Sequence, residues 1–530
     1  MWSEFFPLAA TTLSFLATYL PERSALLSNA LLILGAWLVT KGVQRSYLTS
    51  LWRIPGPLLN SFTNIPLNIY IACGKYHWYT EKLHSKYGLV VRVGYNQVSV
   101  SDASELKRIL STHDFPKGSF YKTMRTLPPT IFSTTDSNLN KTRRRQLGNS
   151  YSLPFVRLYE DKILNHGVLS LISLWNSQIV LSPNQDKTMV NFYYSFHGMA
   201  FDIIGVLGFG KSFDIVSTGN TRMIDCVAKT IKLGAIRSSA PFGKQVERLF
   251  PSWISDREYI RATAISTIKK RKQENVNSGM NGNGINRVDV LQRLVSARDP
   301  FTGKPIDDIS LVAEVLLLLL AGTDTTSNTL TWVILCLLHR PDIYNRLRKE
   351  IRGAFPDKNT VITFDLAKNK LTYLTAVIYE VMRLHPAVSG YLPRSVPEQG
   401  THLMDGKYFL PKGTEICVSL YAYHRNTELW RNPSDFDPER FMGPDSEARI
   451  KDILVFSSGV RICVGRHLAM AELYTTLANL ILRYDFKLPD GKACQNSSVG
   501  NTPGKSFFSY KPKNPDNDCW MVVTPAKTTS

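Results

Sequence analysis

One cysteine sits in a glycine-bearing loop that leads directly into a helix, and this arrangement constrains the fold more than any other feature. Residues 456–465 read FSSGVRICVG, and a helical pattern follows over residues 466–480. The glycines let the backbone turn tightly and approach a neighbouring group closely. A helix N-terminus favours the thiolate form of a cysteine, which is the form that binds metal. The loop therefore predicts that Cys463 is a metal ligand, with Arg461 placed to bind a carboxylate.

A second constrained segment is an apolar helix that ends in polar residues. Residues 315–321 are apolar throughout, which is too short a run to cross a membrane, so the segment predicts a core helix. Ala321 and Gly322 leave room for a flat ligand against the backbone. Thr325 can donate to a carbonyl oxygen one turn earlier. Asp324 is costly to place near a core unless it handles protons or meets a partner.

A third motif pairs Glu380 with Arg383, three residues apart in a helical stretch over residues 371–384. This spacing puts the carboxylate and the guanidinium on one face of a helix. On a surface such a pair contributes little to stability, and E-x-x-R is common by chance. The pair therefore gains meaning only together with the other two motifs.

The cysteine pattern excludes two other classes of protein. Seven cysteines are scattered over 530 residues without a C-x-x-C pair, and there is no H-E-x-x-H helix. This excludes a disulfide framework and the common zinc ribbons, and it is typical of a reducing compartment.

Apolar residues at helical spacing dominate most of the chain. Helices are expected around residues 76–86, 104–111, 192–207, 257–273, 309–338, 341–354 and 371–384, and strands at 90–101 and 415–420. An Asn- and Gly-rich segment at 275–286 predicts a flexible surface loop. We expect a mainly α fold with a minor β-sheet part, formed by one large domain.

The N-terminal region predicts a membrane anchor. Uncharged runs occupy residues 5–21 and 24–40, and the second is apolar enough and just long enough to span a bilayer. Basic residues after it predict that the rest of the chain is cytosolic. Glu4 and the doubled apolar run argue against a cleaved signal peptide. We expect an anchor over residues 1–53, with its main span at about 24–40. The first run is open to three interpretations: a second span, a surface-lying helix or a disordered lead.

Residues 54–57 read IPGP, and prolines around a glycine cannot continue a helix. They predict a hinge between the anchor and a globular body over residues 54–530.

Together these motifs resemble the signature of the haem-thiolate monooxygenases, the cytochrome P450 superfamily. The chain matches F-x-x-G-x-R-x-C-x-G at 456–465, E-x-x-R at 380–383 and A-G-x-D-T-T at 321–326, in the order that the family has. The Pro-Glu-Arg-Phe element at 438–441 and the Pro-Gly-Pro hinge match as well. The resemblance covers roughly residues 54–530 and is closest in style to microsomal fungal members. It implies a P450-type haem domain with haem b as its cofactor.

The resemblance also implies how the chain would hold the haem. Cys463 would be the axial ligand of the haem iron. The propionate-binding arginines would be Arg144, Arg394 and Arg461. The remaining haem contacts would come from small or apolar residues, namely Phe456, Gly459 and Gly465 around the cysteine and Ala321 and Gly322 on the opposite face.

Two further groups of residues receive roles from the resemblance. Asp324 and Thr325 would deliver protons during dioxygen activation. Glu380, Arg383 and Arg440 would form a buried network that fixes the position of the cysteine loop.

One position departs from the pattern of the family. Members usually carry Trp or His four residues before a propionate-binding arginine, whereas this chain has Asn140 four residues before Arg144. Asparagine donates a hydrogen bond but cannot stack, so a haem contact of Asn140 is left open. A solvated basic face is the alternative for residues 143–145.

The charge of the chain is +20, from 63 Lys and Arg against 43 Asp and Glu, which points to an acidic partner. Nucleic acid is a poor candidate because no recognition motif accompanies the charge. The basic cluster at 269–272 is interpreted as a solvated helix end. Basic residues near the cysteine predict docking of the acidic flavin domain of an NADPH–cytochrome reductase; they are Arg449, Lys451, Arg461, Arg466 and His467.

The sequence thus predicts a monooxygenase in the endoplasmic reticulum membrane that hydroxylates a lipophilic small molecule with dioxygen and electrons from NADPH. The alternatives are a reductase-independent isomerase or dehydratase of the same fold, and a non-catalytic haem-binding membrane sensor or carrier. The intact Asp324–Thr325 pair favours oxygenation. The expected substrate contacts are apolar or aromatic and suit a steroid, a terpenoid or a fatty acid alike; they are Phe120, Tyr121, Leu317, Val388, Tyr391 and Phe507.

Overall fold

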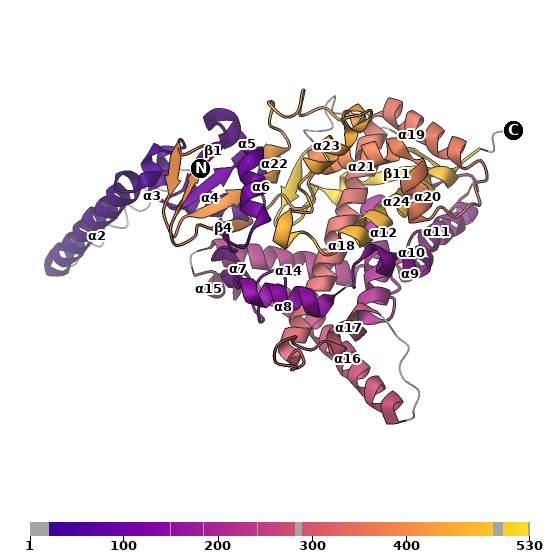
Figure 1. The fold of residues 1–530 in the computed structure, drawn as a ribbon, viewed down its shortest axis with the longest axis horizontal. Coiled ribbons are helices and arrows are strands. Elements are labelled where there is room, and N and C mark those ends of the chain that lie inside the picture. Colours follow the sequence, from indigo (N-terminus) through magenta and orange to yellow (C-terminus); the bar gives the residue numbers. More distant parts are fainter. Residues whose placement is uncertain are drawn as a thin grey trace.

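The computed structural model describes residues 21–148, 150–183, 185–240, 242–280, 289–490 and 502–527. Most of them are helical, and the strands within these ranges form four small sheets (Figure 1). The expectation of a mainly α fold with a minor β part is therefore confirmed.

The α-helices are α2 (Pro21–Tyr47), α3 (Leu58–Phe62), α4 (Ile65–Ala72), α5 (Tyr76–Tyr87), α6 (Ala103–Ser111), α7 (Phe120–Met124), α8 (Ser137–Leu147), α9 (Leu153–Leu158), α10 (Glu160–His166), α11 (Val168–Leu181), α12 (Phe192–Ile204), α13 (Ile215–Thr218), α14 (Arg222–Ser239), α15 (Gly243–Glu247), α16 (Pro251–Met280), α17 (Val290–Ser296), α18 (Asp308–His339), α19 (Pro341–Ala354), α20 (Phe364–Lys370), α21 (Thr372–Leu384), α22 (Leu420–Tyr423), α23 (Ser446–Lys451), α24 (Arg466–Arg483) and α25 (Pro515–Asp518).

The strands are β1 (Val90–Gly94), β2 (Gln97–Val100), β3 (Thr188–Asn191), β4 (Pro393–Ser395), β5 (Thr401–Leu403), β6 (Tyr408–Leu410), β7 (Glu415–Val418), β8 (Tyr484–Lys487), β9 (Gly504–Ser506), β10 (Tyr510–Pro512) and β11 (Trp520–Pro525). The largest sheet has the order β1-β2-β7-β4, with β2 and β7 parallel and the other pairs antiparallel. The alternating stretch expected at 90–101 is thus a hairpin of two strands.

The long helix α18 forms the centre of the helical part. Asp307 caps its N-terminus by accepting a hydrogen bond from the Ser310 amide. Among the described residues it is also the one helix long and apolar enough to cross a membrane by length and composition. Most of its apolar window is nevertheless buried among other helices, so the prediction of a core helix is confirmed.

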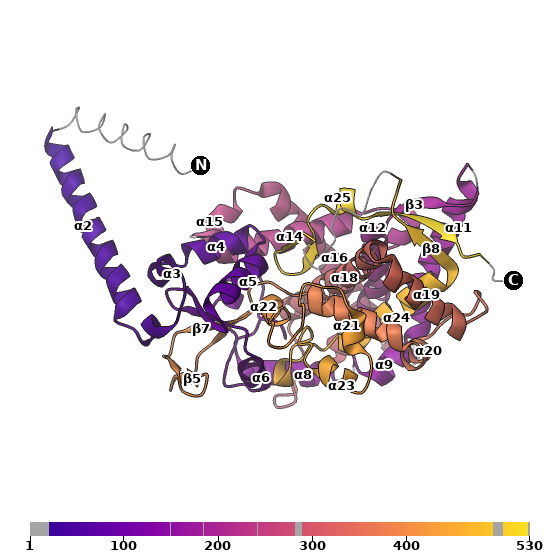
Figure 2. The ribbon, with the colours of Figure 1, turned by 90° about the horizontal axis from the view of Figure 1, so that it is seen from above.

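Helix α2 projects away from the globular body (Figure 2) and contains the predicted span at 24–40. It is followed by the expected hinge, where Ile54 and Pro57 are extended. Gly56 lies against the backbone of Arg92, so a side chain there would overlap the Arg92 carbonyl. The hinge is therefore packed on β1. Residues 5–20 of the first apolar run lie outside the described residues.

Two expectations for the region after α14 need correction. Helix α16 continues to Met280, so the loop expected at 275–286 does not begin at residue 275, and residues 281–288 lie outside the described part. The basic cluster at 269–272 is not wholly solvated, because Arg271 is buried and bonds both oxygens of Asp289, at 2.6 and 2.8 Å. Asp289 also caps α17, so this pair ties the two helices together.

Candidate active site

The cysteine loop is held by its own backbone and by its packing on α6. The Cys463 amide donates to the Phe456 carbonyl at 2.8 Å, and Gly459 begins a short turn at a positive φ of 59°. A side chain at Gly459 would overlap the backbone of Ser111 in α6. Only glycine therefore allows this close approach, which fixes the loop in front of α24.

The Cys463 side chain lines a cavity of about 280 Å³. Burial raises the pKa of the Cys463 thiol, although the Gly465 amide and the charges of Arg144 and Arg466 act in the opposite direction. The lowering expected from the helix N-terminus is thus present through the Gly465 amide, but desolvation outweighs it, so the thiol alone does not favour thiolate. A bound metal cation would provide the missing positive charge and stabilise the thiolate.

Helix α18 forms another part of the cavity wall. Ala321, Gly322, Thr325 and Thr326 line the same cavity as Cys463. The Thr325 hydroxyl donates to the Ala321 carbonyl at 2.8 Å, as the sequence predicted. Gly322 has a packing role as well, because a Cβ there would lie 2.6 Å from Cδ1 of Ile204 in α12.

Asp324, next to Thr325, is buried and turned away from this cavity. Its carboxylate contacts the Nε2 atom of His197 in α12 at 3.4 Å and accepts a hydrogen bond from Ser509. The acid and the hydroxyl of the motif thus lie on different faces of α18.

Four basic side chains converge on one end of the cavity: Lys117, Arg144, Arg394 and Arg461. Burial lowers the pKa of Arg461 to about 10, with further contributions from Arg394 and Arg144. The pKa of Lys117 also lies well below its usual value, because of burial first and then the same arginines. Within the described residues no carboxylate forms an ion pair with any of the four.

The hydrogen bonds of this cationic cluster leave donors free towards the cavity. Arg144 donates to the Ile462 carbonyl, and Arg394 donates to the Phe115 carbonyl at 3.3 Å. Both terminal nitrogens of Arg461 are buried, and neither has a hydrogen-bond partner in the part of the chain that the structure describes. Buried donors and like charges of this kind require an anion, and the two propionates of haem fit that requirement.

Asn140 does not take part in this cluster. It is buried, donates to the Ile131 carbonyl at 2.9 Å and does not line the cavity. Arg143 is also buried, 3.5 Å from Glu314, so the alternative of a solvated basic face is wrong for this residue. Lys117 was not among the residues expected from the sequence. It lies in the cluster because its backbone forms an isolated antiparallel β-bridge with Arg394 of β4.

The Glu380–Arg383 pair is completely buried in α21. Arg383 bonds both oxygens of Glu380 at 2.7 Å and also donates to the carbonyls of His424, Pro433 and Asp435. Arg440 donates to Glu380 at 3.3 Å. The network therefore joins α21 to the chain segment that precedes the cysteine loop.

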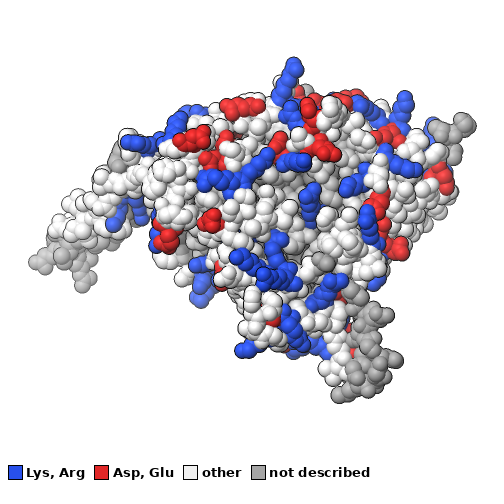
Figure 3. Space-filling model, in the orientation of Figure 1, with Lys and Arg blue, Asp and Glu red and all other residues white. Residues whose placement is uncertain are grey.

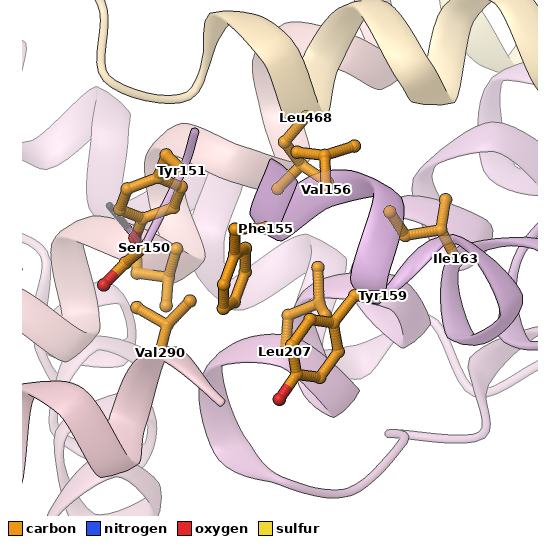
Figure 4. A pocket seen from close by; sticks show the side chains of 10 residues that line it. Ser150, Tyr151, Phe155, Val156, Tyr159, Ile163, Leu207, Val290 and Leu468 are labelled. Carbon is orange, nitrogen blue, oxygen red and sulfur yellow. The ribbon is translucent and has the colours of Figure 1, made fainter. Parts of the chain in front are cut away.

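The remaining cavity wall is mostly apolar and aromatic. Of the expected substrate contacts, Tyr121, Leu317 and Val388 line it. Phe120 and Tyr391 pack edge-to-face behind it, and Phe507 packs on Gly74, while Phe508 lines the cavity instead. A separate apolar hollow of about 10 Å³ lies between α9 and α24 and is far too small for a substrate (Figure 4).

The fold and this site define a haem-thiolate monooxygenase. The family model for Cytochrome P450 matches residues 55–511, so the chain belongs to the cytochrome P450 family. It is 29% identical over 519 residues to the cytochrome P450 monooxygenase helB1 of Aspergillus fumigatus, covering 96% of this chain and 87% of the relative. It is 30% identical over 472 residues to the cytochrome P450 monooxygenase acrD of Aspergillus aculeatus, covering 87% of this chain and 91% of the relative.

A solved structure supports the fold. The haem domain of cytochrome P450DA superposes with a TM-score of 0.73 at 19% identity, covering 90% of this chain and 98% of that one.

Proposed function

We propose that this monooxygenase hydroxylates a lipophilic small molecule, receives electrons from NADPH through a reductase, and is anchored in the endoplasmic reticulum membrane by its N-terminal helix. The observation that carries the proposal is the cavity itself. Its lining brings together the Cys463 thiol, the Thr325 side chain and four basic side chains that lack an anionic partner among the described residues.

Each part of the cavity wall has a distinct task in this proposal. Cys463 would bind the haem iron, and the cationic cluster would hold the propionates, which fixes the orientation of the ring. Haem supplies the activation of dioxygen when it is bound. The apolar wall excludes water and holds a lipophilic substrate beside Thr325. Thr325 and Asp324 hold and move the protons that the reaction consumes.

The test of this function is spectroscopic. The reduced, haem-loaded protein under carbon monoxide is expected to show the red-shifted Soret band of a thiolate-ligated haem. Dodecanoic acid, testosterone and farnesol, added to the oxidised protein, test the lipophilic substrate class by shifts of the Soret band. An unshifted carbon monoxide band would refute the proposed function.

Electron supply distinguishes oxygenation from the isomerase alternative. Product that forms only with dioxygen, NADPH and a reductase supports hydroxylation, whereas conversion of a hydroperoxide without any reductase would support the isomerase. The Thr325 hydroxyl on the cavity wall, with Asp324 behind it, favours the first outcome.

Exposed basic side chains near the cysteine loop support docking of an acidic reductase. Arg449, Lys451, Arg466 and His467 are exposed. Arg461 was expected in the same set, but it is buried and lines the cavity, so it is not part of this surface. Figure 3 shows further basic side chains gathered in the region where Figure 1 places α8. Opposite charge would steer the flavin domain to this surface.

Helix α2 supports the proposed anchor through its exposed surface, not through its overall hydropathy, since α18 is the one helix among the described residues that is long and apolar enough to cross a membrane. Its exposed apolar side chains have no cover from the globular body; they are Leu31, Leu32, Ile33, Trp37 and Val39. Large apolar surface of this kind is unfavourable in water and favourable in a bilayer.

Removal of residues 1–47 is expected to move most of the protein from the membrane pellet to the supernatant after cell lysis and ultracentrifugation. A matched variant with Leu32 and Ile33 both changed to Asp should do the same without shortening the chain. Full membrane recovery of both variants would contradict the anchor.

A further inference from the structure

Behind the cavity, Asp324 is paired with a histidine that no motif of the chain assigns. His197 lies in α12, which packs along α18, and its ring is almost completely buried. Its Nδ1 atom lies 2.8 Å from the Tyr193 carbonyl oxygen, and its Nε2 atom lies 3.4 Å from Oδ1 of Asp324.

These two contacts determine how many protons the pair holds. A backbone carbonyl can only accept a hydrogen bond, so Nδ1 must carry a proton. An ionised carboxylate can also only accept, so Nε2 must carry a proton too unless Asp324 itself is protonated. In either case His197 and Asp324 together hold one proton more than a neutral imidazole beside a carboxylate. An unprotonated contact would set two lone pairs against each other in a buried site.

The groups around the pair stabilise this charge arrangement. Burial by itself would raise the pKa of Asp324, but the hydrogen bond and charge of His197, the charge of Lys511 and the Ser509 hydroxyl hold it below its usual value. Lys511 is partly exposed and donates to the Tyr193 hydroxyl at 3.1 Å. Asn328 donates to the Asp324 carbonyl at 2.6 Å and to Ser509 at 3.3 Å.

We propose that the His197–Asp324 pair is the proton store of the active site, with His197 as a positioning residue that recharges Asp324 behind Thr325. This inference rests on the proposed function and extends it to α12. The chemistry requires such a store, because monooxygenation consumes two protons and two electrons for each dioxygen and releases one oxygen atom as water.

The proton steps balance within the pair. The Nε2–H bond of the imidazolium breaks and an O–H bond forms on Asp324, which leaves neutral imidazole beside neutral acid with the total charge unchanged. Delivery of that proton towards the Thr325 side of α18 leaves a neutral imidazole and a carboxylate. This is the lone-pair contact that the buried site disfavours, so the pair takes up a new proton from solvent.

The first test measures the stored proton directly in the haem-loaded protein. Nuclear magnetic resonance with isotope-labelled histidine, assigned by comparison with His197→Gln, is expected to show either an imidazolium or an Nδ1–H tautomer. In the second case the infrared band of a protonated carboxylic acid should appear and be lost in Asp324→Asn. An Nε2–H tautomer, or an Nδ1–H tautomer beside an ionised Asp324, would overturn the proposal.

The second test follows delivery of the proton and needs no substrate. With NADPH and a reductase, the consumed oxygen leaves as water or as hydrogen peroxide, and water formation requires the further protons. His197→Gln keeps a donor towards Asp324 but cannot release a proton, so water formation should fall roughly tenfold and lose its pH dependence. Exposed His402 provides the matched control, His402→Gln, which should behave as the unchanged protein.

The outcomes separate this inference from the proposed function. Loss of the thiolate-type carbon monoxide band in the unchanged protein would refute the function itself. A normal band together with an unaltered share of water and an unaltered pH profile in His197→Gln would refute only the proton store. If His197→Gln does not fold, His197→Asn is measured in the same way.

Discussion

Replacement of Cys463 by serine is expected to abolish the red-shifted Soret band of the reduced carbon monoxide complex and all monooxygenase turnover. The hydroxyl of serine is a poor metal ligand, and the thiolate is the group that promotes O–O cleavage in this family. The cationic cluster remains intact in this variant, so some haem should still bind. The measurement is a carbon monoxide difference spectrum beside a determination of the haem content.

The control for this variant is Cys73→Ser, because Cys73 is an exposed free cysteine that does not line the cavity. It should keep both the band and the activity. A red-shifted band that persists in Cys463→Ser would show that another residue binds the iron.

The second large effect is expected at Arg383. Arg383→Ala leaves the Glu380 carboxylate buried without its main partner and removes three donors to backbone carbonyls. Breaking a buried ion pair from one side costs about 3–5 kcal/mol, a large part of the stability of a folded protein. We expect little folded, haem-loaded protein, measured as soluble yield and as thermal midpoint. Arg383→Lys should recover only part of the soluble yield and of the thermal midpoint, because lysine cannot donate two parallel hydrogen bonds to a carboxylate.

A surface pair of the same chemistry is the matched control. Arg157 bonds both oxygens of Asp365 at 2.8 and 3.0 Å, but both side chains are exposed. Arg157→Ala should therefore leave the soluble yield and the thermal midpoint nearly unchanged, because an exposed ion pair adds little to stability. An equal loss of soluble yield and thermal midpoint in Arg383→Ala and Arg157→Ala would contradict the structural role assigned to the buried network.

The parts of the site that the sequence predicted well are those formed by short segments. The cysteine loop, the E-x-x-R pair and the end of α18 each combine a local spacing with a local backbone geometry, so the spacing alone indicates which side chains lie together. The long apolar helices were likewise recognisable, because their periodicity reflects burial within one element.

The residues that escaped prediction depend on contacts between distant segments. Lys117 joins the cationic cluster because it bridges β4, and His197 meets Asp324 because α12 packs along α18. Arg271 is buried and pairs with Asp289, which lies 18 residues further along the chain. The spacing of residues along the chain does not indicate contacts between such distant segments. The thiol pKa of Cys463 was misjudged for a related reason, since desolvation depends on the complete fold.

The gathering of Lys117, Arg144, Arg394 and Arg461 has a consequence for the life of the protein in a cell. Like charges held together in a buried space oppose closure of the chain until counter-ions arrive. Binding of haem therefore shifts the folding equilibrium as well as filling a cavity. The amount of intact enzyme would follow the haem supply, since a newly made chain that lacks haem spends longer in open forms that proteases recognise.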